Sequence, residues 1–204
     1  MTKYTKQQAL SIIVDCALKY EQNLSGRNLL FLLKSKELSV SSLEVAFYPY
    51  NFLHLTGVRL NKKISAADFY QKCLNHKLCT EDFSFVQDGT THLKLNVLPL
   101  LMTKNISAKM AGDFQNSSPF LYTDKLIGNV KSCLGFVKTR HACYVPNTVL
   151  NLDIRNATQR TLQVIATYRK RQEESLYNDL VYKSKTVQCE SIHLPEKYSY
   201  LSGL

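Results

Sequence analysis

The sequence predicts an α+β protein in which N-terminal helices are followed by an antiparallel β-meander. Apolar residues recur at helical spacing near the N-terminus. Alternating or β-branched segments follow one another in the last third, separated by turn-forming residues at hairpin-like intervals. This segregation favours an antiparallel sheet over a doubly wound parallel one. With 204 residues and 45% hydrophobic content, the chain is long enough for one sizeable core.

Two helices are expected first. One spans residues 6 to 20, with Thr5 as its N-cap, and the other spans about residues 25 to 33. Their buried positions are Ala9, Leu10, Ile13, Val14, Ala17 and Leu18 in the first helix, and Leu29, Leu30, Leu32 and Leu33 in the second.

The period then changes. Residues 43 to 47 alternate and are followed by Pro49, which predicts a strand. Residues 51 to 60 also alternate, and Gly57 interrupts them, so a short strand or a strand leading into a turn is expected.

Two further helices and a loop are expected in the middle of the chain. Ser65 and Asp68 form a capping pattern that starts a helix running to about residue 75. Another helix lies between residues 91 and 102, where Pro99 bends or ends it. By composition, residues 112 to 119 form a loop.

The meander and the domain organisation complete the predicted fold. The strands are expected at residues 126 to 138, 145 to 154, 161 to 169 and 177 to 183. The predicted parts of the chain are an N-terminal helical segment packed on the core (1 to 42), an α+β domain (43 to 185) and a C-terminal tail (186 to 204).

The net charge is +10, and half of this excess lies between residues 138 and 185, where nine basic and four acidic side chains occur. In the strand that starts at residue 161, Arg169 and Arg171 are expected on the face opposite Tyr168, where they can contact phosphates. The alternative is a solvated face whose charge only keeps the protein soluble. The predicted nucleic-acid-binding residues are Lys138, Arg140, Arg169, Arg171 and Lys183.

Several classes of protein are disfavoured. No phosphate-cradling glycine loop, Rossmann fingerprint, nucleophile elbow or H-E-x-x-H motif occurs. Cys73, His76 and Cys79 are close together, as are His141 and Cys143, but neither group has standard zinc spacing, so no metal and no cofactor is expected. Without a signal peptide or a long apolar segment, we expect a cytoplasmic protein with reduced thiols and no membrane contact.

Metal-free RNA cleavage requires a base, a cation and an acid, which His, Lys, Arg and Tyr can supply. The alternatives are a hydrogen-bonded structural role for His54 and a salt bridge between Asp153 and Arg155 on one strand. The residues considered for this chemistry are His54, His141, Arg155, Arg169, Lys170, Tyr177 and Lys183.

Residues 51 to 60, NFLHLTGVRL, carry an H-L-T-G sequence that resembles the signature of a phage and mobile-element nuclease domain. This domain is the fourth phage-associated subgroup of the barnase–EndoU–colicin–RelE-like (BECR) superfamily. Further similarity lies in V-P-N-T at residues 145 to 148, D-I-R at 153 to 155, and the segment from there to Lys185.

The resemblance implies a BECR-like fold and a metal-independent ribonuclease used in conflict between a host and a mobile element. Carried over by position, the catalytic residues would be His54, Thr56, Arg155, Lys170 and Tyr177. His54 would act as base or acid, Arg155 and Lys170 as phosphate clamps, and Tyr177 as an acid or a stacking platform.

A competing hypothesis is a non-enzymatic inhibitor, similar to anti-CRISPR proteins, that binds a host defence nucleoprotein or its RNA through the basic sheet. The expected partner is RNA or a ribonucleoprotein, with a host defence protein as the alternative partner, and the oligomeric state is not predicted. A DNA-binding regulator has less support, because no helix-turn-helix with a basic recognition helix is evident.

Overall fold

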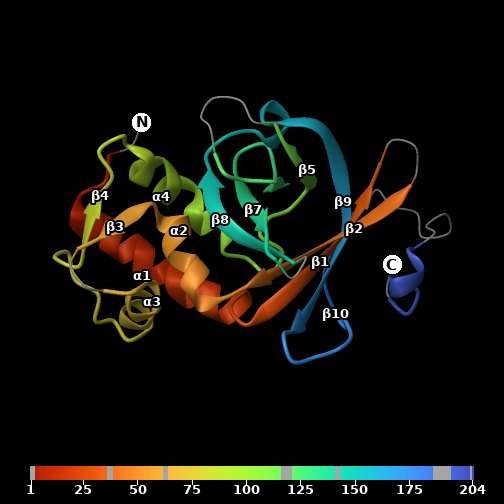
Figure 1. Ribbon diagram of the computed structural model, residues 1–204, viewed down its shortest axis with the longest axis horizontal. Coiled ribbons are helices and arrows are strands. Elements are labelled where there is room, and N and C mark those ends of the chain that lie inside the picture. Colours follow the sequence, from red (N-terminus) through yellow and green to blue (C-terminus); the bar gives the residue numbers. More distant parts are fainter. Residues whose placement is uncertain are drawn as a thin grey trace.

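The computed structural model describes residues 3–35, 39–61, 64–115, 121–140, 143–185, 194–202 and 204. The four α-helices among the described residues gather at one end of an eight-stranded sheet that curls into a barrel (Figure 1). The helices are α1 (Lys6–Asn23), η1 (Pro49–Asn51), α2 (Phe52–Thr56), α3 (Ala66–Leu74), α4 (Thr90–Leu101), η2 (Ile154–Asn156) and η4 (Glu196–Tyr198). The strands are β1 (Arg27–Lys34), β2 (Val40–Phe47), β3 (Val58–Leu60), β4 (Phe83–Phe85), β5 (Met110–Phe114), β6 (Lys125–Gly128), β7 (Cys133–Lys138), β8 (Tyr144–Leu150), β9 (Thr158–Arg171) and β10 (Asp179–Lys183).

The barrel follows the order β1-β2-β8-β7-β6-β5-β9, and β9 pairs with β1 to close it. β10 extends from β9, while β3 and β4 form a separate two-stranded sheet. The β1–β9 ladder is long and begins with Arg27 opposite Arg171. By contrast, β2 and β8 run parallel and share a single residue pair, Val45 and Tyr144. We call this narrow contact the β2–β8 seam.

The predicted order of helices followed by a meander is only partly confirmed. β5 to β8 form an antiparallel meander, with β6 and β7 in place of the single strand predicted at 126 to 138. However, β1 and β2 precede it in the chain and belong to the same barrel. The predicted boundary after residue 42 falls within β2, and the predicted loop at 112 to 119 begins inside β5.

The predicted helix at residues 25 to 33 is wrong, because this segment forms β1. Its apolar run is buried on both faces, since Leu29 and Phe31 pack inside the barrel while Leu30 and Leu32 pack outside it. A short continuous apolar run suits a helix and a fully buried strand equally well. The ladders to β2 and β9 then select the strand.

Residues 51 to 60 are also assigned differently from the prediction. They form the end of η1, then α2, and only then the short strand β3. Gly57 adopts a φ of 69° at the C-cap of α2, so it ends a helix. His54 and Thr56 therefore lie on a helix and its last turn, and a strand face does not relate them.

The two sequence-predicted caps are confirmed. Thr5 and Gln8 form a capping box at the start of α1, as Ser65 and Asp68 do at the start of α3. The helix predicted between residues 91 and 102 is α4, and Pro99 lies inside it, two residues before its end.

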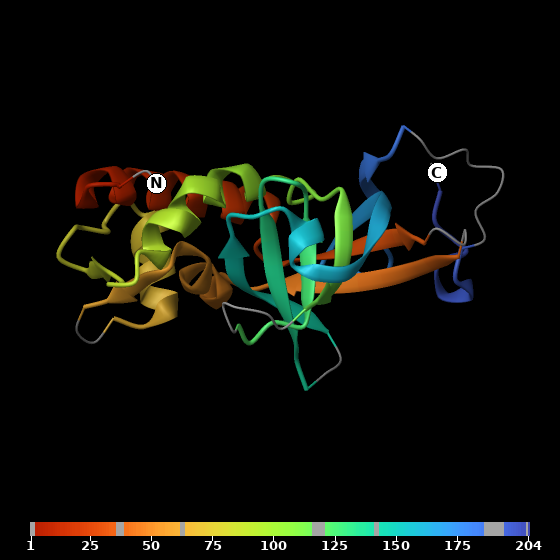
Figure 2. The same cartoon turned by 90° about the horizontal axis from the view of Figure 1, so that it is seen from above.

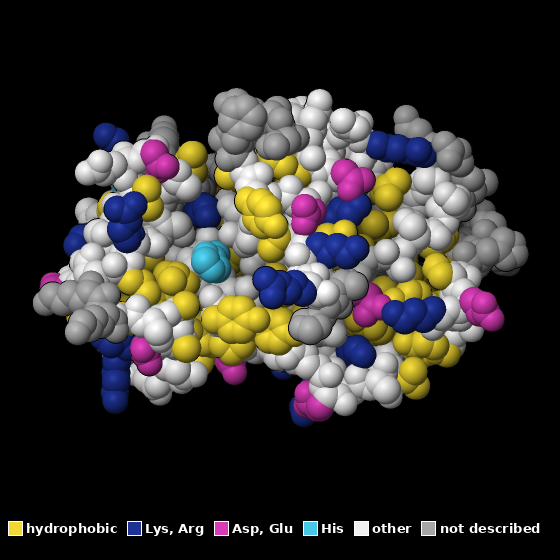
Figure 3. Space-filling model, in the orientation of Figure 1, with side chains coloured by type: hydrophobic (Ala, Val, Ile, Leu, Met, Phe, Trp, Pro, Cys, Tyr) yellow, Lys and Arg dark blue, Asp and Glu magenta, His cyan; other side chains and the backbone are white. Residues whose placement is uncertain are grey.

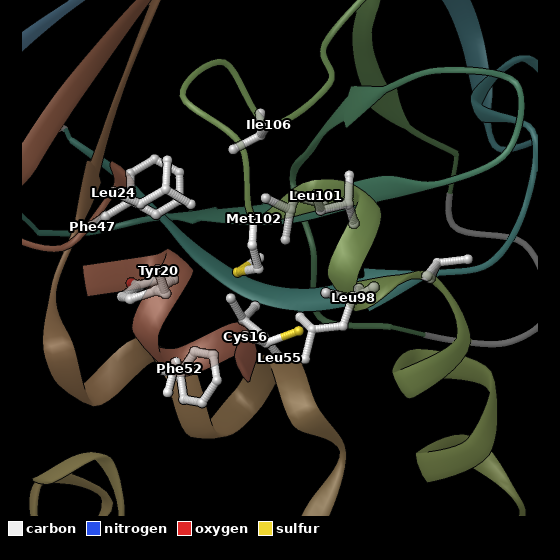
Figure 4. Close-up of a cluster of buried hydrophobic side chains, with 14 of the residues drawn as sticks. Cys16, Tyr20, Leu24, Phe47, Phe52, Leu55, Leu98, Leu101, Met102 and Ile106 are labelled. Atoms are coloured by element: carbon white, nitrogen blue, oxygen red, sulfur yellow. The ribbon is translucent and has the colours of Figure 1, made fainter. Parts of the chain in front are cut away.

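The main core lies between the helices and the inside of the barrel. Figure 4 shows side chains from α1, α2, α4 and β2 meeting there, with Cys16 and Tyr20 of α1 close to Phe52 and Leu55 of α2. Tyr20 is fully buried, and the centre of its ring lies 5.3 Å from the centre of the Phe52 ring. This packing fixes α2, and with it the H-L-T-G segment, against the end of the barrel.

A second apolar cluster covers the outer side of β1 and β9. Its members from the sheet include Leu30, Leu32 and Tyr168, and the C-terminal segment 194–202 adds Tyr198 and Leu201. Of the predicted tail, residues 186–193 lie outside the described residues, whereas the segment after them packs on the barrel and forms η4.

Candidate active site

The H-L-T-G segment folds into a compact turn at the end of α2. The Thr56 hydroxyl donates to the Leu53 carbonyl at 2.8 Å and accepts from the Val58 amide at 3.3 Å. A Cβ on Gly57 would lie 2.8 Å from Cδ of Lys94 and 3.3 Å from Cα of Thr91. Glycine is thus required both for its backbone conformation and for the close approach of α4.

Lys94 of α4 lies over this turn. Its ammonium donates to the main-chain carbonyl of His54 at 2.8 Å. Burial lowers the pKa of Lys94 to about 8, and the carboxylate of Asp88 opposes this shift. A lysine whose pKa is lowered toward neutral pH is suited to proton transfer, and this property distinguishes Lys94 from an ordinary surface lysine.

A pocket of about 270 Å³ brings Lys94 together with the exposed side chain of His54. The pocket lies between α2 and the start of α4, and we call it the α2–α4 pocket. Its lining residues are Leu53, His54, Gly57, Val58, Val86, Asp88, Thr90 and Lys94. It thus places an imidazole, an ammonium, a carboxylate and a hydroxyl around one space, which is a suitable set of groups for acid–base chemistry.

Tyr177 and Lys170 lie together in a different part of the molecule. The Tyr177 hydroxyl donates to Glu44 of β2 at 3.0 Å, and the Lys170 ammonium lies 5.0 Å from the centre of the Tyr177 ring. Glu44 also accepts hydrogen bonds from Lys197, at 2.5 Å, and from the hydroxyl of Tyr198. We call Glu44, Tyr177, Lys197 and Tyr198 the Glu44 cluster.

The Glu44 cluster holds the C-terminal segment on the barrel, because Lys197 and Tyr198 of that segment both donate hydrogen bonds to Glu44. Burial raises the pKa of Glu44, but the hydrogen bonds from Lys197, Tyr198 and Tyr177 outweigh it, and the resulting pKa lies below the ordinary value. Burial and the neighbouring Glu44 charge raise the pKa of Tyr177 far above its usual range. Tyr177 is only 4% exposed, so it is poorly placed to give a proton to a substrate.

Arg155 occupies a third place. It lies in η2 and forms an ion pair with Asp153 at 2.6 Å. The salt bridge considered from the sequence is therefore present. Its two residues lie at the start of a 3₁₀ helix and not on a strand.

The structure does not bring the predicted catalytic residues into one cleft. His54 and Thr56 share the α2 turn, and Lys170 contacts Tyr177 of the Glu44 cluster, whereas Arg155 lies in η2 and belongs to neither group. Figures 1 and 2 show α2 among the helices at one end of the molecule and β10 at the far side of the barrel. The fold thus places these segments apart. A single sequence does not show how far apart such segments lie in space. His141, which was also considered, lies outside the described residues.

The predicted nucleic-acid-binding residues are also divided. Arg169 forms an ion pair with Asp179 at 2.6 Å, and Arg171 lies 3.9 Å from Glu173. The side chains of Lys138, Arg140 and Lys183 are exposed. Figure 3 shows basic side chains spread over one face of the molecule, among hydrophobic patches and acidic side chains.

The predicted alternation of side chains between the two faces of β9 is only partly present. A β-bulge leaves Ile165 between Val164, which pairs with Leu33, and Ala166, which pairs with Leu32. Val164 packs inside the barrel and Tyr168 packs outside it, although strict alternation would place them on one face.

Sequence reasoning missed Lys94 and Glu44. No motif marks either residue, because each gains its surroundings from packing between distant segments. The only signal for Lys94 was Gly57, since a glycine after a short helix indicates a close approach of another segment as well as a turn.

The described residues show no group of three side chains suited to a metal ion. The cysteines among them are free thiols, and burial raises the pKa of Cys16, Cys73 and Cys133 to about 12. Within the same described ranges, no helix is both long enough and apolar enough to cross a membrane.

The mixed α/β barrel fits the Barnase–EndoU–colicin–RelE class of nuclease-like proteins. The chain matches the family model of phage-Barnase-EndoU-ColicinE5/D-RelE like nuclease 4 over residues 12–186, and it belongs to that family. No curated protein and no solved structure matches it. The match includes both the α2–α4 pocket and Tyr177 but ends before the C-terminal segment.

Proposed function

We propose that this protein is a cytoplasmic, metal-independent endoribonuclease of a phage or mobile element, and that it cuts RNA in the α2–α4 pocket. The observation that carries the proposal is the placement of an exposed imidazole and of an ammonium whose pKa is lowered by burial on one pocket, beside the turn formed by H-L-T-G. Family membership supports a nuclease.

In the proposed reaction, the His54 imidazole accepts the proton of the ribose 2′-hydroxyl. The 2′-oxygen then forms a bond to phosphorus, and the bond from phosphorus to the 5′-oxygen breaks with its electron pair moving to that oxygen. Lys94 stabilises the charge of the phosphorane and protonates the leaving oxygen. An ammonium has three donors, so the bond to the His54 carbonyl leaves two for the phosphate. The products carry a cyclic 2′,3′-phosphate and a 5′-hydroxyl.

The test is cleavage of end-labelled RNA in the presence of EDTA. His54→Ala and Lys94→Ala should each slow cleavage by about 10²–10⁴-fold, the usual contribution of acid–base groups. His76→Asn is the matched control, because His76 is an exposed histidine with a φ of 54°, a conformation that asparagine tolerates. No cleavage by the unaltered protein, or full cleavage by both alanine variants, would show the proposal to be wrong.

A second candidate function is a non-enzymatic inhibitor that binds a host defence protein, a ribonucleoprotein or its RNA. It is supported by the burial of Tyr177 and by the separation of the basic residues of β9 from the α2–α4 pocket. Capture of a stoichiometric ribonucleoprotein from host lysate, with no RNA turnover by the purified protein, would favour this function over the enzyme.

A further inference from the structure

Three arginines meet where β1 pairs with β9. Arg27 and Arg171 lie directly opposite each other in the antiparallel ladder, and Arg169 lies diagonally across from Arg27. Side chains that are directly or diagonally opposite project from the same face of a sheet. All three line a pocket of about 180 Å³, which we call the arginine pocket.

Like charges that face each other across a ladder destabilise it unless something compensates for them. Part of the compensation is internal. Arg169 pairs with Asp179, and Arg27 donates to the carbonyls of Glu21 and Ser25 at the end of α1, where cations are favoured. Among the described residues, however, no carboxylate forms an ion pair with Arg27, and the partner of Arg171 is 3.9 Å away.

Two further observations indicate an incompletely neutralised site. Burial lowers the pKa of Arg27, the charges of Arg169 and Arg171 lower it further, and the carboxylates of Glu21 and Asp179 oppose this shift without cancelling it. Four cationic and two anionic side chains line the pocket, together with the amide of Asn178, so two positive charges are in excess. The lining residues are Arg27, Arg169, Lys170, Arg171, Glu174, Asn178 and Asp179.

We propose that the arginine pocket binds a phosphate monoester dianion, namely the terminal 5′-phosphate of an RNA strand. Guanidinium groups match phosphate oxygens in a bidentate geometry, and two excess positive charges match a dianion better than the single charge of an internal phosphodiester. The RNA part of this inference rests on the proposed function, whereas the phosphate part rests on the arginines alone.

The experiment measures binding of fluorescent 2′-O-methyl RNA, which cannot be cut, with either a 5′-phosphate or a 5′-hydroxyl. The unaltered protein should bind the phosphorylated strand about tenfold more tightly. Arg27→Gln and Asn178→Asp should both abolish this preference, and Asn178 is an exposed side chain whose replacement leaves the arginines in place. Lys131→Gln, at an exposed site in the β6–β7 turn, should leave it unchanged.

Adenosine 5′-monophosphate is the second probe, and it separates a free nucleotide from an RNA end. Competition by the nucleotide as strong as that by the phosphorylated strand would identify a nucleotide site and overturn the RNA assignment. An equal affinity for both strands, or a preference that survives Arg27→Gln and Asn178→Asp, would overturn the inference. No cleavage by the unaltered protein, or full cleavage by both His54→Ala and Lys94→Ala, would instead refute only the proposed function, provided that the 5′-phosphate preference is intact.

Discussion

Gly57 determines where the Lys94 ammonium lies, because the lysine stem crosses the turn at the one residue that has no Cβ. A single glycine thus links the backbone of α2 to the chemistry of α4. Because of this contact, Gly57 should respond to replacement by alanine differently from Gly26, which has nearly the same φ.

Gly57→Ala should destabilise the protein more than Gly26→Ala. Both residues have a positive φ, 69° and 68°, but a Cβ on Gly26 would meet nothing within 4 Å. We expect a loss of about 1 kcal/mol for Gly26→Ala from backbone strain alone, and about 2–4 kcal/mol for Gly57→Ala from strain plus overpacking. Urea unfolding monitored by circular dichroism measures both, and equal losses would contradict the contact with Lys94.

The pH dependence of cleavage should reflect Lys94. Its pKa lies at about 8, and only the protonated form can give a proton to the leaving oxygen, so the rate should fall as the pH rises through 8. Lys94→Arg should lower the rate, because a guanidinium is a much weaker acid than an ammonium, and it should remove this decline from the remaining activity, because the guanidinium stays charged throughout that range. A pH–rate profile of both proteins tests this, and an unchanged upper limb in Lys94→Arg would assign the decline to another group.

Among the elements, the capped helices could be predicted from the sequence and the barrel strands only in part. Thr5 and Ser65 carry local signals that act within one turn, and both helices start where predicted. β1 could not be recognised, since its leucines are buried on one face by the helices and on the other by the C-terminal segment. Neither partner is visible in a local pattern.

Glu44 is the point at which the C-terminal segment is fastened to β2. Its carboxylate accepts bonds from Tyr177, Lys197 and Tyr198, and its side chain is 29% exposed. The hydrogen bonds to a charged acceptor that is mostly shielded from water contribute more than a surface ion pair does.

Glu44→Gln should therefore lower the free energy of unfolding by about 1–2 kcal/mol at neutral pH. Glu173→Gln is the control, because Glu173 is exposed and lies 3.9 Å from its partner, and it should change little. The folded state lowers the pKa of Glu44, so its contribution is present above the ordinary carboxyl pKa and is lost as the pH falls through the folded value. Urea unfolding of both variants across this range checks the direction, and a difference that grows in acid would contradict it.

At the scale of the whole molecule, the sequence indicated the meander but could not indicate the closed barrel. Closure depends on β9 pairing with β1 and on the narrow β2–β8 seam, and both contacts join segments far apart in the chain. Other non-local contacts decide which residues share a site. Packing of α4 against the α2 turn brings Lys94 to His54, whereas Tyr177 contacts Glu44 of β2. The motif residues could therefore be recognised from the sequence, but their grouping could not.

The net charge of +10 should make RNA binding strongly dependent on salt, because Lys and Arg side chains that contact phosphates displace the counterions bound there. We expect log affinity to fall linearly with log salt, and Arg171→Gln to reduce the slope by about 0.7, the value for one contact to a single strand. Fluorescence anisotropy between 50 and 200 mM salt measures this slope. A slope that Arg171→Gln leaves unaltered would exclude Arg171 from the phosphate contacts.

The bulge at Ile165 has a consequence for how the molecule unfolds. The extra residue shifts the alternation of β9, so this one strand contributes Val164 to the core inside the barrel and Tyr168 to the cluster outside it. Neither cluster can come apart without disturbing a strand that the other needs. The two layers should therefore melt together, in one cooperative transition, even though the barrel wall keeps their side chains apart.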